Sequence, residues 1–372
     1  MKVALLVPGG VDRSMEYRVI PCLLWLIERL AAAVDLHVFA FRQEARPVRY
    51  PLLGAEVHNI GARPTRLRLA GTIWREHARS PFDVLHAVWV ARQGVVAAGM
   101  AKLLRRPLLL HVTGGDLAAL PDIGFGLLAG TRGRWWLRLA ARGASLVTVP
   151  SDWMRRLALE HGVVAERLPL GVARDRWPAS PPRPRQPSAP ARLLHVASLN
   201  RVKDQRTLLR AVEGLRGEGL PFRLEIVGQD TLRGEVHRFA AERGLGDLVT
   251  FHGFVPHSQL RPFVERADLL LISSRHEADP IVTLEAAVAG VPTVGTAVGH
   301  IADWSPEAAA AVPVGDADAL AREIGALLRN EPRRLRMAAA AQARAVHEDA
   351  DWSAQRILGI YQTLTGRAGG AG

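Results

Sequence analysis

Residues 273–294 read SSRHEADPIVTLEAAVAGVPTV, and this stretch predicts a short helix between two buried strands. Asp279 suits the N-cap, Pro280 suits the first helical position, and Gly290 suits the residue after the helix end. The first free backbone N–H groups, at residues 281–283, then point out of the helix N-terminus, where the helix dipole favours an anion. The stretch therefore predicts a βαβ unit with an anion site at its helix start.

Two carboxylates flank this helix start. Glu277 lies in the loop before the helix, and Glu285 lies about a turn and a half inside it. A nucleotide diphosphate with a sugar on one side and a ribose on the other fits that arrangement. The alternative, for this segment alone, is an ordinary capped helix with two solvated glutamates.

Short apolar runs alternate with helical stretches along the chain, which is typical of parallel sheets covered by helices. Residues 177–190 interrupt this pattern with six prolines, which favour neither a helix nor a central strand. We therefore predict an α/β protein with two Rossmann-like, doubly wound domains. The predicted segments are an N-terminal domain at 1–176, a linker at 177–190, a second domain at 191–350, and a terminal helix at 351–372 with a flexible Gly-rich end.

Composition limits the class of protein. At 372 residues and 48% apolar side chains, the chain can bury two cores. Its single cysteine, Cys22, excludes an internal disulfide and suits a reducing compartment. We find neither a signal peptide nor an apolar run of membrane-spanning length, so we expect a cytoplasmic protein, or one held peripherally on the inner membrane face.

The net charge of +12 indicates an anionic partner. Nucleic acid is disfavoured, because no binding motif is recognisable and the arginines are scattered over predicted helices. A nucleotide or a phospholipid surface therefore remains as the candidate anionic partner. Residues 131–142, TRGRWWLRLAAR, combine arginines with Trp135 and Trp136, as interfacial helices do, although a surface helix packed on the sheet has the same pattern.

The order of motifs resembles the retaining glycosyltransferases of family 4, which are two-domain enzymes of the GT-B fold. Glu277-x7-Glu285 followed by Ala-x-Ala-Gly-Val-Pro is similar to the donor-site signature of that family. Further matching motifs are Gly9-Gly10, HVTGGD at 111–116, HVASLNRVKD at 195–204 and FHGF at 251–254. The resemblance implies that the two domains face a cleft, that the first is the acceptor side, and that the last helix crosses back to the first domain.

The resemblance also implies roles for single residues. Glu277 is expected to bind hydroxyls of the donor sugar, Glu285 the ribose, and Lys203 the diphosphate. His111 is expected to contact the reacting sugar, so that the catalytic set is His111, Lys203 and Glu277. The implied donor-binding set is Gly9, Gly10, Asp116, Ser198, Arg201, Lys203, Gly253, Glu277, Ile281, Val282, Thr283 and Glu285.

A second argument, independent of the family resemblance, supports Lys203 as a site residue. It follows a predicted strand, at the sheet edge where open α/β folds bind ligands. The chain has only three lysines among 48 basic residues, and a compact ammonium suits a diphosphate, although a solvated surface lysine is the alternative. The family usually has an arginine where this chain has Ser198. We expect Arg201 to supply that missing cation.

His111 ends an apolar strand, and the glycines after it permit close backbone approach, so we expect it to face the cleft rather than the core. Asp116 is expected to orient either its own loop or the acceptor hydroxyl. Gly9-Gly10 lacks the third glycine of a GxGxxG turn, which disfavours a nicotinamide cofactor. The residues at 278–280 and His300 depart from the family pattern, so donor specificity does not carry over.

We interpret the chain as a glycosyltransferase that moves a sugar from a nucleotide diphosphate to a hydroxyl of a glycan, a lipid or a small molecule. The alternatives are a nucleotide-sugar epimerase of the same architecture and a non-catalytic nucleotide-sugar-binding protein. No metal or other cofactor is expected, because neither an Asp-x-Asp pair nor grouped His and Cys ligands appear.

Overall fold

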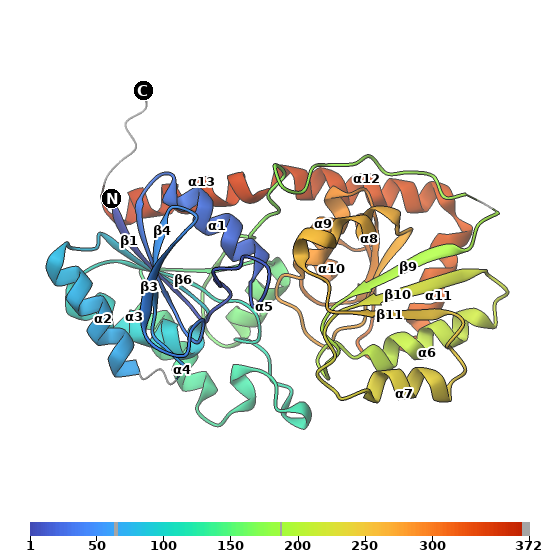
Figure 1. Cartoon of the computed structure of the whole chain (residues 1–372), viewed down its shortest axis with the longest axis horizontal. Coiled ribbons are helices and arrows are strands. Elements are labelled where there is room, and N and C mark those ends of the chain that lie inside the picture. The colour runs from blue at the N-terminus through green and yellow to red at the C-terminus, as the bar shows by residue number, and fades with distance from the viewer. Residues whose placement is uncertain (63–65, 187, 367–372) are drawn as a thin grey trace. The chain divides into compact units, whose positions relative to one another are not determined.

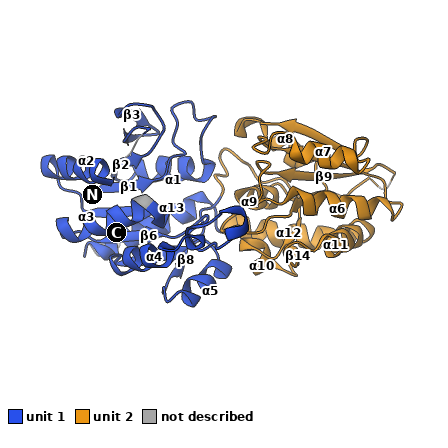
Figure 2. Cartoon of the chain, turned by 90° about the horizontal axis from the view of Figure 1, so that it is seen from below, with its two compact units in different colours: residues 1–171, 348–372 blue, residues 172–347 orange. Residues whose placement is uncertain are grey.

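The computed structural model describes residues 1–62, 66–186 and 188–366. The chain divides into two compact units, Met1–Gly171 with Glu348–Gly372 and Val172–His347 (Figure 2). Each unit holds one sheet with helices on its faces (Figure 1). The predicted fold class, two doubly wound parallel-sheet domains, is confirmed. The Gly-rich end that was expected to be flexible, at 367–372, lies outside the described residues.

Unit 1 has an eight-stranded sheet in the order β3-β4-β2-β1-β5-β6-β7-β8. Neighbouring strands are parallel, except that β3 is antiparallel to β4. From β4 to β7 the order is that of the doubly wound fold, which reverses between β1 and β5. The strands are β1 (Lys2–Val7), β2 (Asp35–Ala40), β3 (Val48–Leu52), β4 (Ala55–Asn59), β5 (Val84–Val88), β6 (Leu108–His111), β7 (Leu146–Val149) and β8 (Glu166–Arg167).

The central strands of unit 1, β1, β5 and β6, are buried along their whole length because helices cover both faces of the sheet. All six residues of β1, KVALLV, are buried. The last helix of the chain belongs to this unit, where the Tyr361 hydroxyl lies 2.7 Å from His86 Nδ1 on β5. The helices are α1 (Pro21–Ala31), α2 (Arg66–Arg79), α3 (Val95–Leu104), α4 (Gly133–Arg142), α5 (Asp152–Glu160) and α13 (Ala350–Leu364).

Unit 2 has a six-stranded parallel sheet in the order β11-β10-β9-β12-β13-β14, which reverses between β9 and β12. The strands are β9 (Ala191–Val196), β10 (Phe222–Val227), β11 (Val249–Gly253), β12 (Leu269–Ile272), β13 (Thr293–Thr296) and β14 (Ala309–Val312). The helices are α6 (Gln205–Arg216), α7 (Glu235–Glu242), α8 (Arg261–Arg266), α9 (Ile281–Val288), α10 (Gly299–Trp304), α11 (Ala317–Arg329) and α12 (Glu331–His347).

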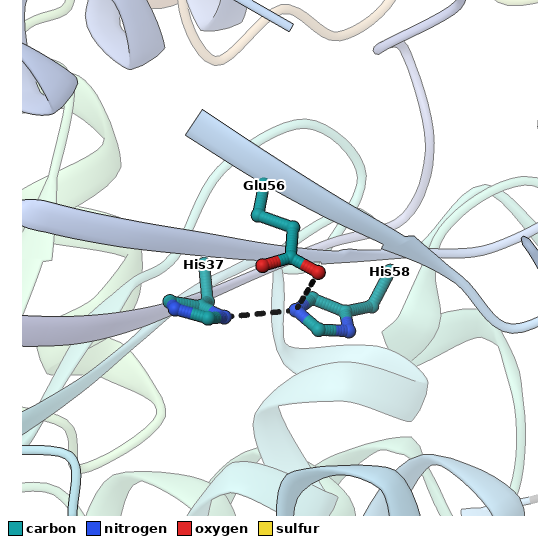
Figure 3. Close-up of side chains that lie close together, drawn as sticks. All are labelled: His37, Glu56 and His58. Atoms are coloured by element: carbon teal, nitrogen blue, oxygen red, sulfur yellow. Dashed lines mark hydrogen bonds and ion pairs between the residues drawn. The ribbon is translucent and has the colours of Figure 1, made fainter. Parts of the chain in front are cut away.

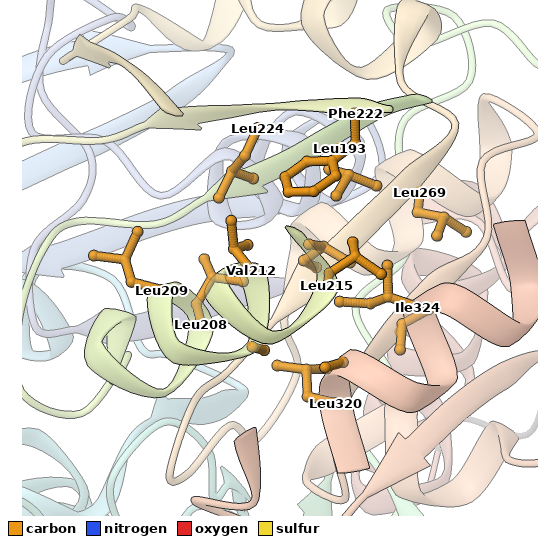
Figure 4. Close-up of a cluster of buried hydrophobic side chains, with 14 of the residues drawn as sticks. Leu193, Leu208, Leu209, Val212, Leu215, Phe222, Leu224, Leu269, Leu320 and Ile324 are labelled. Atoms are coloured by element: carbon orange, nitrogen blue, oxygen red, sulfur yellow. The ribbon is translucent and has the colours of Figure 1, made fainter. Parts of the chain in front are cut away.

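The core of unit 2 lies between its sheet and the helices α6 and α11 (Figure 4). Leu208, Val212 and Leu215 recur at helical spacing on α6 and are fully buried against strand residues such as Leu193 and Leu224. This apolar stripe fixes α6 on the sheet, and with it the loop that joins β9 to α6.

The Pro-rich segment predicted as a linker packs on unit 2. Trp177 is buried and donates a hydrogen bond from Nε1 to the Glu285 carbonyl, 3.0 Å away. The buried Arg334 donates from Nη2 to the Arg183 carbonyl, 2.7 Å away. Among the described residues, no helix combines the length and the apolar content that crossing a membrane needs.

Candidate active site

The carboxyl ends of β9 and β12 define the candidate site in unit 2. These strands are neighbours at the point where the strand order reverses, and open α/β sheets bind ligands outside the carboxyl ends of the strands at such a point. The loop after β9 carries Lys203, and the loop after β12 carries Glu277. Parallel topology therefore brings together two residues that are 74 positions apart.

Lys203 and Glu277 form an ion pair, with 2.5 Å between Nζ and Oε1. Ser274 donates from Oγ to the same carboxylate oxygen at 2.6 Å. Ser273 donates from Oγ to the Lys203 carbonyl at 2.8 Å, which fixes the backbone of the lysine. The side chains of Lys203 and Glu277 are 25% and 12% exposed, so the pair is shielded but still reachable. A ligand that contacts both groups must therefore break the ion pair between them.

A neutral histidine lies beside this pair. His195 is fully buried on β9, and its pKa is lowered to about 4, chiefly by burial and also by the Lys203 ammonium, against the hydrogen bond to Leu271 and the Glu277 carboxylate. Its Nδ1 donates to the Leu271 carbonyl at 2.9 Å, so Nε2 accepts from the Gln205 amide at 3.2 Å. The imidazole thus joins β9, β12 and the start of α6 beneath the charged groups.

Glu285 is 2% exposed, and its Oε1 lies 2.5 Å from His257 Nε2. The His257 ring stacks on Trp177, with centroids 5.4 Å apart and an interplanar angle of 29°. Sequence reasoning missed both partners, because neither lies in the Glu-x7-Glu segment. A buried carboxylate needs a polar partner, which is a reason to look for one but does not name it.

The start of α9 differs from the prediction. The helix begins at Ile281, and Pro280, with extended backbone at ψ 93°, occupies the N-cap. Asp279 as the N-cap is therefore wrong. The Thr283 N–H donates to the Pro280 carbonyl at 2.8 Å, so the first turn already uses this predicted amide. Of the three predicted amides, only those of Ile281 and Val282 remain as the expected donors to a bound anion.

Asp279 instead faces the other residue that departs from the family pattern. Its Oδ1 lies 2.8 Å from His300 Nε2, and both side chains are buried. His300 stacks on Trp304 of α10, with ring centroids 5.5 Å apart. Gly299 has φ +52°, and a Cβ there would lie 3.0 Å from the Glu277 carbonyl oxygen. The loop that carries Glu277 thus packs closely against the start of α10.

The remaining residues of unit 2 that were predicted to bind the donor sugar nucleotide lie at the ends of strands or in loops at the same sheet edge. Arg201 is over half exposed, and its guanidinium lies 3.2 Å from the Glu235 carboxylate on α7. The Ser198 carbonyl accepts from the Gln205 amide at 3.2 Å. The Gly253 carbonyl at the end of β11 accepts from the Gly228 N–H at 2.8 Å. Arg201 thus has a carboxylate partner of its own.

In unit 1, the two polar residues singled out by sequence are both buried. His111 ends β6, and its Nδ1 lies 3.0 Å from Thr148 Oγ1 on β7. Asp116 accepts at one oxygen, Oδ2, from the N–H groups of Val90 at 2.8 Å and Thr113 at 3.3 Å. Burial raises the pKa of Asp116 to about 7, although these two hydrogen bonds act to lower it. The carboxyl therefore links the loop after β6 to the segment after β5.

The glycine pair of unit 1 is required by local packing. Gly10 has φ +78°, and a Cβ there would lie 2.6 Å from Ile20 Cγ1. A Cβ at Gly9 would lie 2.8 Å from Gln43 Nε2. Substitution at either position therefore displaces the loop after β1.

The two doubly wound sheets place this protein in the class of α/β proteins whose ligand sites lie at the carboxyl ends of the strands, at a switch point. Two family models identify it further: "Glycosyl transferases group 1" matches residues 178–344 and "Glycosyl transferase 4-like domain" matches residues 19–171. Together they span most of the chain. The protein belongs to glycosyltransferase family 4.

Curated relatives are similar over part of their length. A 2-deoxystreptamine N-acetyl-D-glucosaminyltransferase of Streptomyces fradiae is 32% identical over 159 residues, 42% of this chain and 38% of the relative. A D-inositol 3-phosphate glycosyltransferase of Xylanimonas cellulosilytica is 30% identical over 181 residues, 47% of this chain and 43% of the relative. The matched region thus spans about two fifths of these relatives.

Solved structures match almost the whole chain. A sucrose-phosphate synthase from Thermosynechococcus elongatus has a TM-score of 0.82 at 18% identity, with 99% of this chain and 100% of that chain covered. Anabaena HepE in complex with UDP-glucose has a TM-score of 0.74 at 19% identity, with 98% and 100% covered. At this identity the likeness establishes the fold, which is GT-B.

Proposed function

We propose that this protein is a retaining glycosyltransferase that moves a sugar from a nucleotide diphosphate donor to an acceptor hydroxyl. The observation that carries the proposal is the Lys203–Glu277 ion pair, 2.5 Å between Nζ and Oε1, at the switch point of unit 2. In the complex with donor, the ammonium turns to the diphosphate and the carboxylate turns to hydroxyls of the sugar. The family to which the chain belongs supports this assignment.

The leaving diphosphate gains negative charge as its bond to the sugar breaks. A cation aimed at it therefore stabilises the transition state more than the bound donor. Lys203 supplies this charge, and the amides of Ile281 and Val282 at the start of α9 add oriented dipoles. In the proposed front-face displacement, a diphosphate oxygen helps to take the proton of the acceptor hydroxyl, and the acceptor bonds to the face that the diphosphate leaves. These groups perform the step without a metal ion.

Two further roles belong to the proposal. Glu285 binds the ribose, whose hydroxyls then join or replace His257 as partners of the carboxylate, now 2.5 Å from Nε2. His111 acts on the reacting sugar from the end of β6. Both roles are carried over from the family resemblance, and the buried positions of the two side chains limit them to ligands that enter deeply.

An epimerase and a non-catalytic nucleotide-sugar-binding protein are the alternatives, and one experiment separates all three. The protein is incubated with a nucleotide sugar, with and without acceptor, and the release of nucleoside diphosphate is measured. We expect release that depends on acceptor. An altered sugar without an acceptor would favour the epimerase, and binding with no conversion in any acceptor mixture would favour the binding protein.

The names of similar proteins suggest the first compounds for this experiment. One solved structure contains UDP-glucose, so UDP-sugars are the first donors. Two relatives are named for 2-deoxystreptamine and D-inositol 3-phosphate, so polyhydroxylated cyclitols are the first small acceptors. A product mass that equals acceptor plus one sugar identifies the transfer.

We also propose that α4 holds unit 1 on an anionic membrane, which would suit a lipid-linked acceptor. Trp135 is 56% exposed and Leu139 is 40% exposed, and Arg138 and Arg142 lie on the same side of the helix at i+3 and i+7 from Trp135. Trp136 contributes less, because it is only partly exposed and Arg66 lies over its ring, 4.2 Å from the centroid. Exposed indole and guanidinium groups together fit anionic headgroups.

Co-sedimentation with vesicles tests this attachment. Vesicles with anionic phospholipid should bind the protein, and neutral vesicles should not. The combined change Trp135→Ser, Arg138→Gln and Arg142→Gln should abolish binding, while Trp74→Ser, at another exposed tryptophan on α2, should not. Equal binding by all variants, or none by the wild type, would favour a dissolved acceptor.

A further inference from the structure

Two neighbouring strands of the unit 1 sheet, β2 and β4, carry metal-ligating side chains that the proposed transfer does not use. His37 lies on β2, and Glu56 and His58 lie on the neighbouring strand β4. In the register of this parallel pair, His37 is opposite Glu56 and Phe39 is opposite His58, so these side chains share one face of the sheet. Figure 3 shows the two imidazoles meeting edge to edge with the carboxylate beside them.

The donor atoms are close to the spacing that a metal ion needs. His37 Nδ1 and His58 Nε2 are 2.9 Å apart, and Glu56 Oε1 is 4.0 Å from the same His58 nitrogen. One ligand atom from each residue lies within 4.8 Å of the other two. Tetrahedral zinc with bonds of about 2.0–2.1 Å separates its ligand atoms by roughly 3.3 Å. Binding therefore needs the two nitrogens to separate by about 0.4 Å, their rings to turn toward the ion, and the carboxylate to rotate.

The rings are already held in orientation. Asp35 Oδ1 lies 3.4 Å from His37 Nε2, the nitrogen that faces away from the group. A carboxylate at that nitrogen fixes the tautomer and orientation of a metal-ligating histidine. Phe39 stacks on His58 with centroids 4.6 Å apart, and Phe82 meets the edge of His37 at 5.6 Å. The site is therefore supported by groups behind both imidazoles.

The charges around the group permit a cation. Three carboxylates, of Asp35, Glu56 and Glu76, act on the imidazoles, against the cations of Lys2 and Arg49. Arg49 binds Glu76 closely and reaches Glu56 at 3.4 Å, so Glu56 can turn to a metal while Arg49 keeps Glu76. Glu56 is half-exposed, which gives the ion a way in.

We propose that His37, Glu56 and His58 form a zinc site that ties β2 to β4 in unit 1. Two imidazoles and one carboxylate are the donor set of zinc sites with three protein ligands and a water in the fourth position, and this borderline-soft ion accepts nitrogen and oxygen ligands together. The site lies in a different unit from the Lys203–Glu277 pair. Its role is to bind metal and stabilise the pairing of β2 with β4, and it is independent of the expectation that transfer needs no metal.

Cobalt is the probe, because tetrahedral Co²⁺ absorbs visible light and is displaced by Zn²⁺. The full chain, freed of metal with a chelator, is titrated with Co²⁺ and then with Zn²⁺. We expect one ion per chain, a visible absorption band that Zn²⁺ removes, and a higher Tm with Zn²⁺. Glu56→Gln and His58→Gln should each lose the band and the shift in Tm, and Asp35→Asn should weaken binding by about tenfold.

His237→Gln is the matched control. His237 also faces one carboxylate, with 3.8 Å between its Nδ1 and Asp230 Oδ2, but it lies in unit 2. This variant should keep the band and the Tm shift. A folded wild type that shows neither effect would overturn the proposal and leave the two imidazoles as an ordinary hydrogen-bonded pair. A full band in Glu56→Gln would also overturn it, and this half-exposed position keeps the test valid if His58→Gln fails to fold.

Discussion

Six strands of unit 1, from β4 to β7 across the sheet, have the same order as the sheet of unit 2, but the two units use the carboxyl edge in different ways. In unit 2, the charged groups there bind each other, as in Lys203 with Glu277, and remain partly exposed. In unit 1, the carboxyl of Asp116 is buried and accepts from the backbone of Thr113 in its own loop and of Val90 after β5. The comparison teaches that a shared fold fixes which loops come together. The partners of the polar side chains then decide whether those side chains are available to a ligand or are bound to the protein backbone.

The largest expected effect is at Lys203. If unit 2 carries the charge that acts on the leaving group, Lys203→Ala should lower kcat by about a hundredfold or more, the range for losing one preorganised donor at a developing charge. Lys203→Arg should recover part of the activity, because it restores charge but not the compact geometry. Steady-state kinetics at saturating donor and acceptor measure this. The matched control is Lys102→Ala on α3, which should keep normal kcat. A Lys203→Ala enzyme with normal turnover would reject the diphosphate role.

The next effect separates the two glutamates of unit 2. Glu277→Gln should mainly lower kcat, because its carboxylate is assigned to the reacting sugar. Glu285→Gln should mainly weaken nucleotide binding, because its carboxylate is assigned to the ribose. Each loss should be about 1–3 kcal/mol for a charged hydrogen bond. Kinetics and calorimetric binding of the nucleoside diphosphate distinguish the two, and equal, near-wild-type values for both variants would contradict the site.

The next test concerns Asp116 in unit 1, where the expected effect is on stability rather than on turnover. Burial raises its pKa from 3.8 to about 7, so between pH 4 and 7 the native chain holds a proton that the unfolded chain has lost. This group therefore lowers the unfolding free energy as pH rises through that window, and the effect levels off above pH 7. Asp116→Asn keeps an acceptor oxygen for Val90 and Thr113 and should remove this fall.

Denaturant unfolding at pH 5 and pH 8 measures the difference. The difference in unfolding free energy between Asp116→Asn and the wild type should rise by about 2–3 kcal/mol from pH 5 to pH 8, because about two pH units of that range lie between 3.8 and 7 and each is worth about 1.4 kcal/mol. A constant difference between the two proteins would show that the Asp116 carboxyl does not titrate in this window. A large loss of kcat at full stability would instead place Asp116 on the acceptor.

The smallest effect is expected at Arg201, the proposed substitute for the missing family arginine. Its guanidinium lies 3.2 Å from Glu235 and is over half exposed. Arg201→Ala should therefore weaken nucleoside diphosphate binding by only about 0.5 kcal/mol, as for other exposed charge pairs. Glu235→Gln should strengthen that binding slightly by releasing the arginine. A loss at Arg201 as large as that at Lys203 would mean that the arginine leaves Glu235 when the donor binds.

Much of the fold was predictable because its signals are local. Apolar runs such as KVALLV at β1 and the Gly290 turn after α9, where φ is +71°, appear in the sequence as the structure has them. The start of α9 was misplaced by one residue, because an Asp-Pro pair suits an N-cap only if Asp279 is not drawn elsewhere. Its carboxylate is drawn to His300, 21 residues later, and no local signal reports such a contact.

The sequence by itself determined the two α/β domains, the Glu277-x7-Glu285 segment and Lys203 as site candidates, because strand periodicity, turn residues and motif spacing are properties of neighbouring residues. Only the tertiary structure decided which of these groups bind each other. The pairing of Lys203 with Glu277, of Glu285 with His257, and of His37 with His58 each joins distant segments. The physical reason is that parallel strands place the ends of remote segments side by side, and burial then requires each polar group to find a partner there.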